Sequence, residues 1–130
     1  MTSLLDGLDD ADRGRLKPAP AAFVAPMLAT LTADRFSDPD WIFERKLDGV
    51  RAVAVRDGSG ASLWSRNEKP MDATYPELVD AVAAHVPAGT VLDGEIVAFA
   101  GAQTSFERLQ ARIGLHDPDA ARASGVPLTP

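Results

Sequence analysis

The stretch FERKLDGVR (residues 43–51) concentrates side chains that could do chemistry. Lys46 lies between Glu44 and Asp48 at alternating positions, and Arg51 follows shortly after. If the stretch forms a half-buried strand, the first three of these side chains share one face, although strand interiors rarely hold so much charge. Gly49 follows at once, which permits a sharp turn and close approach of a ligand. An isolated K-x-D-G sequence is, however, more often an ion-paired surface lysine.

The distribution of charge favours an anionic ligand near this lysine. The net charge is −6, which argues against a protein that merely coats nucleic acid. Residues 41–70 nevertheless carry six Lys and Arg against four acidic residues, a local charge of +2, so the remainder carries −8. A locally basic centre in an acidic chain suits an anion that is held at one place.

The composition is that of one soluble globular domain. The chain has 130 residues, of which 45% are hydrophobic and 25% are charged. The absence of cysteine excludes disulfides, thiolate metal sites and cysteine nucleophiles. We find neither an apolar run of about 18 residues nor a secretory signal pattern. We therefore expect a cytoplasmic protein with no membrane partner.

Alternating apolar residues predict an antiparallel sheet. Residues 41–47 and 50–56 alternate, and the DGSG turn joins the second of these to residues 61–65 as a hairpin. Residues 90–99 predict a further strand, although Asp93-Gly94 within it could equally form a tight turn. Most strand neighbours are therefore expected to run antiparallel.

Capping signals predict three helices. A Thr74/Glu77 capping box would begin the first helix and Thr104/Glu107 the second, while Asp117 would cap a short third. Apolar stripes support the first two helices: Leu78, Val79, Val82 and Val86 in one, and Phe106, Leu109 and Ile113 in the other. The fold class is therefore expected to be mixed α+β.

The two ends of the chain predict less regular structure. Residues 1–22 contain a short helix-capable stretch followed by KPAPAA, whose prolines end any helix, so we expect a flexible extension. The domain itself is expected over residues 23–130. The final stretch GVPLTP (residues 125–130) is loop-like, and a sheet this short would leave an edge exposed.

Four motifs in sequence order resemble a known superfamily. They are KLDGVR (46–51), SRNEKPMDATYPEL (65–78), VLDGEIVAF (91–99) and SFERLQARIG (105–114). Together they resemble the nucleotidyltransferases, which include ATP-dependent DNA ligases, RNA ligases and mRNA capping enzymes. The likeness is greatest to the adenylation domain of bacterial ATP-dependent DNA ligases and covers roughly residues 24–128. It implies an antiparallel-sheet, ATP-grasp-like fold in truncated form.

The resemblance implies a covalent reaction at Lys46, which matches the family nucleophile. In this family the lysine attacks the α-phosphate of ATP, expels pyrophosphate and carries AMP as lysyl-AMP. The AMP then activates the 5′-phosphate of a nick in double-stranded DNA, and the 3′-hydroxyl displaces it. Arg45, Arg51 and Mg²⁺ would favour the neutral amine, and Mg²⁺ would neutralise the phosphates. The implied cofactors are ATP and Mg²⁺, and the implied roles are DNA repair, replication and recombination.

The first motif supplies four further site residues by the same carry-over. Glu44 matches the position that contacts the adenine region, through its side chain or its backbone. Asp48 and Gly49 match the turn behind the lysine, where glycine permits a sharp turn and close approach of a ligand. Arg51 matches the arginine that contacts the ribose or the reacting phosphate.

The later motifs supply three more residues, each with an alternative. Arg66 matches an arginine that reaches the nucleotide or the DNA backbone, but it could be a solvated loop residue. Glu95 matches the acid associated with the ribose and the metal, whereas a lone Asp-Gly-Glu is usually a turn. Phe106 matches the aromatic that stacks on adenine, yet its helical stripe fits core packing nearly as well. Glu68 departs from the glycine that related ligases often have, which leaves the local turn open.

Other candidate residues fit structural roles better. His85 lies on a predicted helix beside apolar residues and is expected to be satisfied or exposed. His116 lies in a predicted loop without a second metal ligand at a suitable spacing. Trp41 and Trp64 are expected in the core rather than as stacking platforms.

The resemblance stops early, and alternatives remain open. Later metal- and phosphate-binding motifs and the DNA-clamping OB-fold domain of related ligases have no counterpart here. We therefore expect a gene fragment, a split-gene product or a remnant that cannot complete ligation alone. It could be a non-catalytic nucleotide-binding remnant, or it could bind a chain that supplies the missing half. An RNA ligase or capping enzyme is less favoured, and an NAD-dependent ligase is discounted because only 45 residues precede Lys46.

Overall fold

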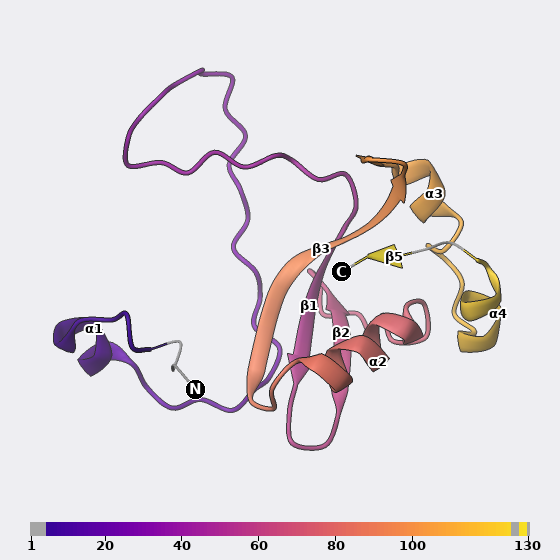
Figure 1. Ribbon diagram of the computed structural model, residues 1–130, viewed down its shortest axis with the longest axis horizontal. Helices are drawn as coiled ribbons and strands as arrows, with labels where there is room; N and C mark the ends of the chain where they lie inside the picture. Colours follow the sequence, from indigo (N-terminus) through magenta and orange to yellow (C-terminus); the bar gives the residue numbers. More distant parts are fainter. Residues whose placement is uncertain (1–4, 126–127, 130) are drawn as a thin grey trace.

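The computed structural model describes residues 5–125 and 128–129, which form two unlike parts (Figure 1). A short helix, α1 (Asp10–Arg15), is followed by a long excursion without helix or strand, residues 17–49, which we call the arm. Helices and strands from Val50 onward form a packed unit, which we call the sheet module. The predicted boundary after residue 22 stays a prediction, and residues 1–4 of that extension lie outside the described residues.

The predicted hairpin is confirmed. Strand β1 (Val50–Arg56) pairs antiparallel with β2 (Ala61–Ser65). The Asp57 carboxylate holds the turn, because it accepts hydrogen bonds from the Ser59 hydroxyl (2.7 Å), Ser59 N (2.7 Å) and Gly60 N (2.9 Å). These bonds, led by that of the Ser59 hydroxyl, lower the pKa of Asp57.

A long third strand organises the rest of the sheet. Strand β3 (Thr90–Ala100) pairs with β1, and its later half pairs with β4 (Gln103–Thr104) and β5 (Leu128–Thr129). The strand order is β2-β1-β3-β4, and every pairing is antiparallel, which confirms the predicted mixed α+β class. Asp93 and Gly94 lie within β3, so they form no turn.

Strand β5 also corrects the loop prediction for the final stretch. Leu128 pairs with Ala98 and Thr129 with Val97, so part of this stretch lies in the sheet. The rest of the predicted loop, apart from Gly125, lies outside the described residues. A two-residue strand carries almost no periodic signal, which is why the pattern did not predict it.

Helix α2 (Pro76–His85) covers one face of the sheet and closes the core. The predicted capping box is wrong, because Tyr75 is the N-cap residue and no side chain caps the helix. Glu77 instead binds the guanidinium of Arg112, and the buried Thr74 presents its carbonyl to the same group. The core consists of buried residues of β1–β3, the helices and the connection before α2: Ala52, Ala54, Leu63, Met71, Tyr75, Leu78, Ile96, Ala98 and Leu109.

Two short helices follow the sheet. In α3 (Phe106–Gln110) the N-cap is Ser105 rather than the predicted Thr104, and its hydroxyl accepts from Arg108 N at 3.4 Å. In α4 (Pro118–Ala123) the predicted cap is confirmed, with Ala120 N donating to the Asp117 carboxylate at 2.8 Å. The apolar stripe of α3 ends earlier than expected, since Leu109 is buried but Ile113 is 45% exposed.

The predicted strand over residues 41–47 is wrong. These residues have no strand partner among the described residues, and alternation without a neighbouring strand leaves the backbone groups to water. Trp41, expected in the core, is 61% exposed and packs edge-on against Phe36. Trp64 is half-buried, and Phe23 of the arm packs against it at 6.3 Å between ring centroids.

Candidate functional site

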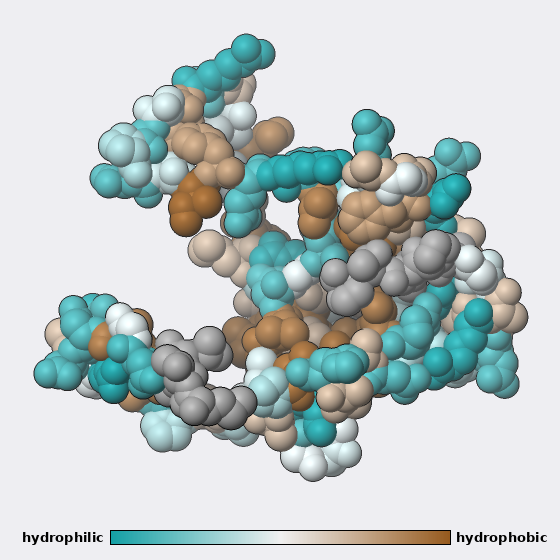
Figure 2. All heavy atoms as spheres, in the orientation of Figure 1, coloured by the Kyte–Doolittle hydropathy of each residue, from teal (hydrophilic) through white to brown (hydrophobic). Residues whose placement is uncertain are grey.

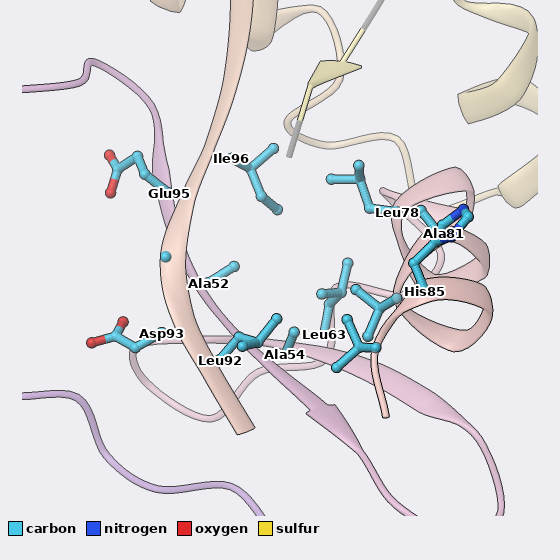
Figure 3. A pocket seen from close by; sticks show the side chains of 13 residues that line it. Ala52, Ala54, Leu63, Leu78, Ala81, His85, Leu92, Asp93, Glu95 and Ile96 are labelled. Carbon is cyan, nitrogen blue, oxygen red and sulfur yellow. The ribbon is translucent and has the colours of Figure 1, made fainter. Parts of the chain in front are cut away.

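The two faces of the sheet differ in chemistry. Ala52, Leu92 and Ile96 point toward an apolar cavity of about 410 Å³ between the sheet and α2 (Figure 3). Along β3, Asp93 and Glu95 lie between Leu92 and Ile96, and their side chains point to the other side of the strand (Figure 3). The face away from α2 is therefore where charged side chains gather.

Three residues of β1 and β3 form a charged group on this face, which we call the Arg51 cluster: Arg51, Asp93 and Glu95. The Arg51 Nε–H donates to Asp93 Oδ1 at 2.9 Å, and its Nη2 donates to Asp93 Oδ2 at 2.6 Å. Glu95 is the direct register partner of Arg51 across the two strands. The hydrogen bond with Asp93 raises the pKa of Arg51 and lowers the pKa of Asp93, and the charge of Glu95 also raises the pKa of Arg51.

Glu95 is the unengaged carboxylate of the cluster. It is half-buried and accepts no hydrogen bond from any residue in the described ranges. Within those ranges no group of three or more metal-ligating side chains lies close enough to hold a metal ion. Glu95 can therefore face a ligand, but a complete metal cage of protein side chains is not formed among the described residues.

Gly49 joins the arm to this cluster. A Cβ atom added there would lie 2.2 Å from the carbonyl oxygen of Ile96 and 3.0 Å from Cγ of Glu95. Only glycine fits such a close backbone approach, so the structure gives Gly49 a packing role against β3. Lys46 is three residues away, which limits its Cα to about 11 Å from that of Gly49.

The other residues of the first motif are not on a common strand face. Glu44, Lys46 and Asp48 are all exposed on the arm, and none forms an ion pair with a residue that the structure describes. The prediction that they share one face of a half-buried strand is wrong, because no strand forms there. Their roles toward a nucleotide stay predictions.

The remaining predicted site residues lie apart from one another. Arg66 is exposed and follows Ser65, the register partner of Ala52, so it lies at the Arg51 end of the hairpin. Phe106 is half-buried and packs against the core on the α2 side of the sheet, not with the Arg51 cluster. Their nucleotide contacts stay predictions, although this position of Phe106 fits the core-packing alternative.

The turn after Arg66 forms although Glu68 stands at the position where the resemblance implies glycine. Glu68 has a φ of 56°, in the left-handed region that glycine adopts without strain. Its amide donates to the Ser65 carbonyl at 2.9 Å, and the Ser65 hydroxyl accepts from Asn67 N and Lys69 N. The turn therefore forms, and it tolerates a residue that its backbone disfavours.

Asp93, which the structure pairs with Arg51, was not among the residues that the motifs predicted. The signal was present, because Asp93 and Glu95 are two positions apart and share a face if the segment is a strand. The Asp-Gly dipeptide also fits a turn, which made that face uncertain. Pairing with β1 removes the ambiguity and brings Asp93 to Arg51.

Comparison with known proteins identifies the family. Residues 26–124 match the protein-family model described as "ATP dependent DNA ligase domain". The chain therefore belongs to the ATP-dependent DNA ligase domain family, as the four motifs predicted. No helix of the described residues is long and apolar enough to cross a membrane.

Named relatives support the same family. The chain is 46% identical over 91 residues to "DNA ligase C" of Mycobacterium tuberculosis, an alignment that covers 69% of this chain and 25% of that protein. It is 42% identical over 90 residues to "DNA ligase C2" of Mycolicibacterium smegmatis, covering 69% and 25% respectively. It is 37% identical over 91 residues to "SPbeta prophage-derived DNA ligase-like protein LigB" of Bacillus subtilis, covering 69% and 33%. The aligned part is thus a quarter to a third of these relatives.

Proposed function

We propose that this chain is the part of an ATP-dependent DNA ligase that carries the AMP-accepting lysine. In this proposal the neutral amine of Lys46 attacks the α-phosphorus of ATP. An N–P bond forms, the bond to the pyrophosphate oxygen breaks, pyrophosphate leaves, and the amine nitrogen releases one proton to water. The observation that carries the proposal is the Arg51 cluster, which lies on the sheet face against which Gly49 of the KLDGVR motif packs.

The cluster supplies both charges that a nucleotide requires. The Arg51 guanidinium is suited to phosphate or ribose oxygens because its planar fork presents several donors. The free carboxylate of Glu95 is suited to ribose hydroxyls. Glu44, Asp48, Arg66 and Phe106 are proposed as further nucleotide contacts by family resemblance, with Phe106 the weakest of them since it packs against the core.

Mg²⁺ fits this site as a companion of the nucleotide. Magnesium in nucleotide sites is held by one or two carboxylates together with phosphate oxygens and water. Glu95 is the available carboxylate, since Asp93 is taken by Arg51. When bound, the ion would neutralise the phosphates so that an electron-rich amine can approach them.

The substrate and cellular roles are proposed from the family. We propose nicked double-stranded DNA as the substrate of the complete ligase, with use in repair, replication or recombination in the cytoplasm. Because the chain aligns with only 25% of DNA ligase C, we assign the sealing step to a longer polypeptide or to a complementary chain. We expect the 130-residue chain alone to stop at the lysyl-AMP adduct.

A second candidate is a nucleotide-binding remnant, or half of a split ligase, that does not react. The exposure of Lys46, with no ion pair to a described residue, favours it. An RNA ligase or capping enzyme is less favoured, since the relatives above are named as DNA ligases.

A labelling experiment separates these functions. The purified chain is incubated with Mg²⁺ and α-phosphate-labelled ATP or GTP, and acid-labile label on the protein is measured. The ligase proposal predicts label from ATP and little from GTP. Preference for GTP would favour a capping-type enzyme, and tight binding of ATP without label would favour the non-reacting remnant.

A further inference from the structure

We propose that Asp93 is a positioning residue that holds the Arg51 guanidinium in the orientation in which it meets the nucleotide. The inference rests on the proposed function, because it concerns the same site. Asp93 would act through Arg51, without touching the ligand itself.

The geometry shows how Asp93 would act. A guanidinium has five N–H donors, of which Asp93 uses one on Nε and one on Nη2, so three remain free, two of them on Nη1. The two bonds fix the plane of the group, since a carboxylate and a guanidinium meet as a planar fork. The Nη1 edge is therefore the part of Arg51 that is presented to a phosphate or ribose oxygen.

The position of Glu95 shows why Arg51 needs Asp93 as a separate partner. It is the direct cross-strand partner of Arg51, and directly opposed side chains of opposite charge attract. Without Asp93, the Arg51 guanidinium would be free to turn to Glu95 and pair with it. Asp93 thus keeps Arg51 oriented and leaves the Glu95 carboxylate open to the ligand.

Because the Arg51–Asp93 ion pair is partly exposed, we expect it to orient Arg51 while contributing little to the stability of the fold. The side chains of Arg51 and Asp93 are 31% and 47% exposed, and ion pairs at such positions contribute little to folding. Substitution of Asp93 should therefore change ligand binding without unfolding the protein. The chain offers a matched control in Arg122 and Asp80, an ion pair at 2.7 Å with side chains 47% and 66% exposed.

The test measures affinity for α,β-methylene ATP, which cannot lose pyrophosphate, by calorimetric titration with Mg²⁺. The proteins are the parent, Asp93→Asn, Arg51→Ala, the double variant and Asp80→Asn. We expect Asp93→Asn to weaken binding about three- to tenfold, as is typical for coupled neighbours. Asp80→Asn should bind like the parent. In the Arg51→Ala background, Asp93→Asn should have no further effect.

A second measurement follows Arg51 without nucleotide. The Arg51 Nε–H resonance in nuclear magnetic resonance spectra should be protected from exchange in the parent and in Asp80→Asn, and lose protection in Asp93→Asn. Three results would overturn the role of Asp93 but leave the proposed function standing. They are parent-like affinity in Asp93→Asn, an equal loss from Asp93→Asn in the Arg51→Ala background, and an unprotected Arg51 Nε–H in the parent. Failure of the parent to bind the analogue would instead contradict the proposed function, and the inference with it.

Discussion

The arm and the sheet module contain similar alternating sequences, but only those of the module have neighbouring strands among the described residues. Both contain alternating apolar residues, but residues 50–56 lie between two other strands, whereas residues 41–47 have no strand partner among the described residues. The arm consequently presents large apolar side chains to solvent (Figure 2). They are Val24, Met27, Leu28, Leu31, Phe36, Trp41, Ile42, Phe43 and Leu47. A strand pattern becomes a strand only where neighbours complete its hydrogen bonds.

The difference also separates two halves of the proposed chemistry. Lys46 lies on the exposed arm, while Arg51 and Glu95 lie on the paired strands of the module. Gly49, packed against β3, lies between the two parts. We therefore expect changes in the buried part of the module to affect stability, changes of Lys46 or of the Arg51 cluster to affect chemistry, and changes of Gly49 to affect both.

The largest loss of stability should come from Arg112→Ala, which removes contacts within the sheet module and none in the arm. The Arg112 side chain is 1% exposed, donates to Glu77 at 2.6 and 2.9 Å and to the Thr74 carbonyl at 2.7 Å. Removing one partner of a buried pair costs about 3–5 kcal/mol, and we expect the lower end because the Glu77 side chain is 33% exposed. Urea denaturation measures the change.

The control for this variant is Arg122→Ala, which removes an exposed partner of Asp80. It should cost about 0–1 kcal/mol. Equal losses in the two variants would contradict the account of Arg112 as a buried link between α2 and the segment after α3.

The next largest effect should come from Gly49→Ala, which tests the junction between arm and module. The added methyl would meet the Ile96 carbonyl at 2.2 Å, so the backbone must shift. Such overpacking costs about 1–3 kcal/mol, and it should also lower the yield of AMP adduct. Gly58→Ala, in open space within the hairpin turn, should leave both unchanged. Parent-like stability in Gly49→Ala would show that the arm is not packed against β3.

A smaller effect should appear in the pH dependence of the module. Burial raises the pKa of Glu77, but the hydrogen bonds from Arg112 and the nearby positive charges outweigh it, so the net pKa is lowered from 4.5. A lowered folded-state pKa contributes stability above the unfolded value, and that contribution is lost as the pH falls through the folded value. Between pH 7 and pH 3 the parent should therefore lose more stability than Glu77→Gln. Equal losses would contradict a role for this ion pair.

The smallest effect should be a gain, from Glu68→Gly. Glycine adopts the left-handed φ of 56° without steric cost, although it loses more backbone freedom on folding. The balance is a gain of about 0.5–1 kcal/mol in the free energy of unfolding. Glu68→Ala keeps the strained backbone and should show no gain. A gain in stability in Glu68→Ala would show that loss of the Glu68 charge, rather than relief of backbone strain, stabilises the protein.

The sequence predicts those elements whose signals are local and consistent. The Asp57 turn, the alternation of residues 50–56 and the Asp117 cap each depend on nearby residues, and all three are confirmed. The Thr74/Glu77 capping box failed because Glu77 binds Arg112, 35 residues away. The Arg51–Asp93 pair joins residues 42 apart and depends on strand register, which no local pattern reveals. Motifs predict candidate site residues, whereas the hydrogen-bond partners of those residues depend on packing.

The most direct test of the account is to locate the AMP after reaction with ATP and Mg²⁺. The chain has three lysines, Lys17, Lys46 and Lys69, so peptide mass spectrometry can assign the adduct without ambiguity. We expect AMP on Lys46 alone, no adduct in Lys46→Arg, and an unchanged adduct in Lys69→Arg. AMP on Lys17 or Lys69, or an adduct that persists in Lys46→Arg, would contradict Lys46 as the AMP-accepting lysine.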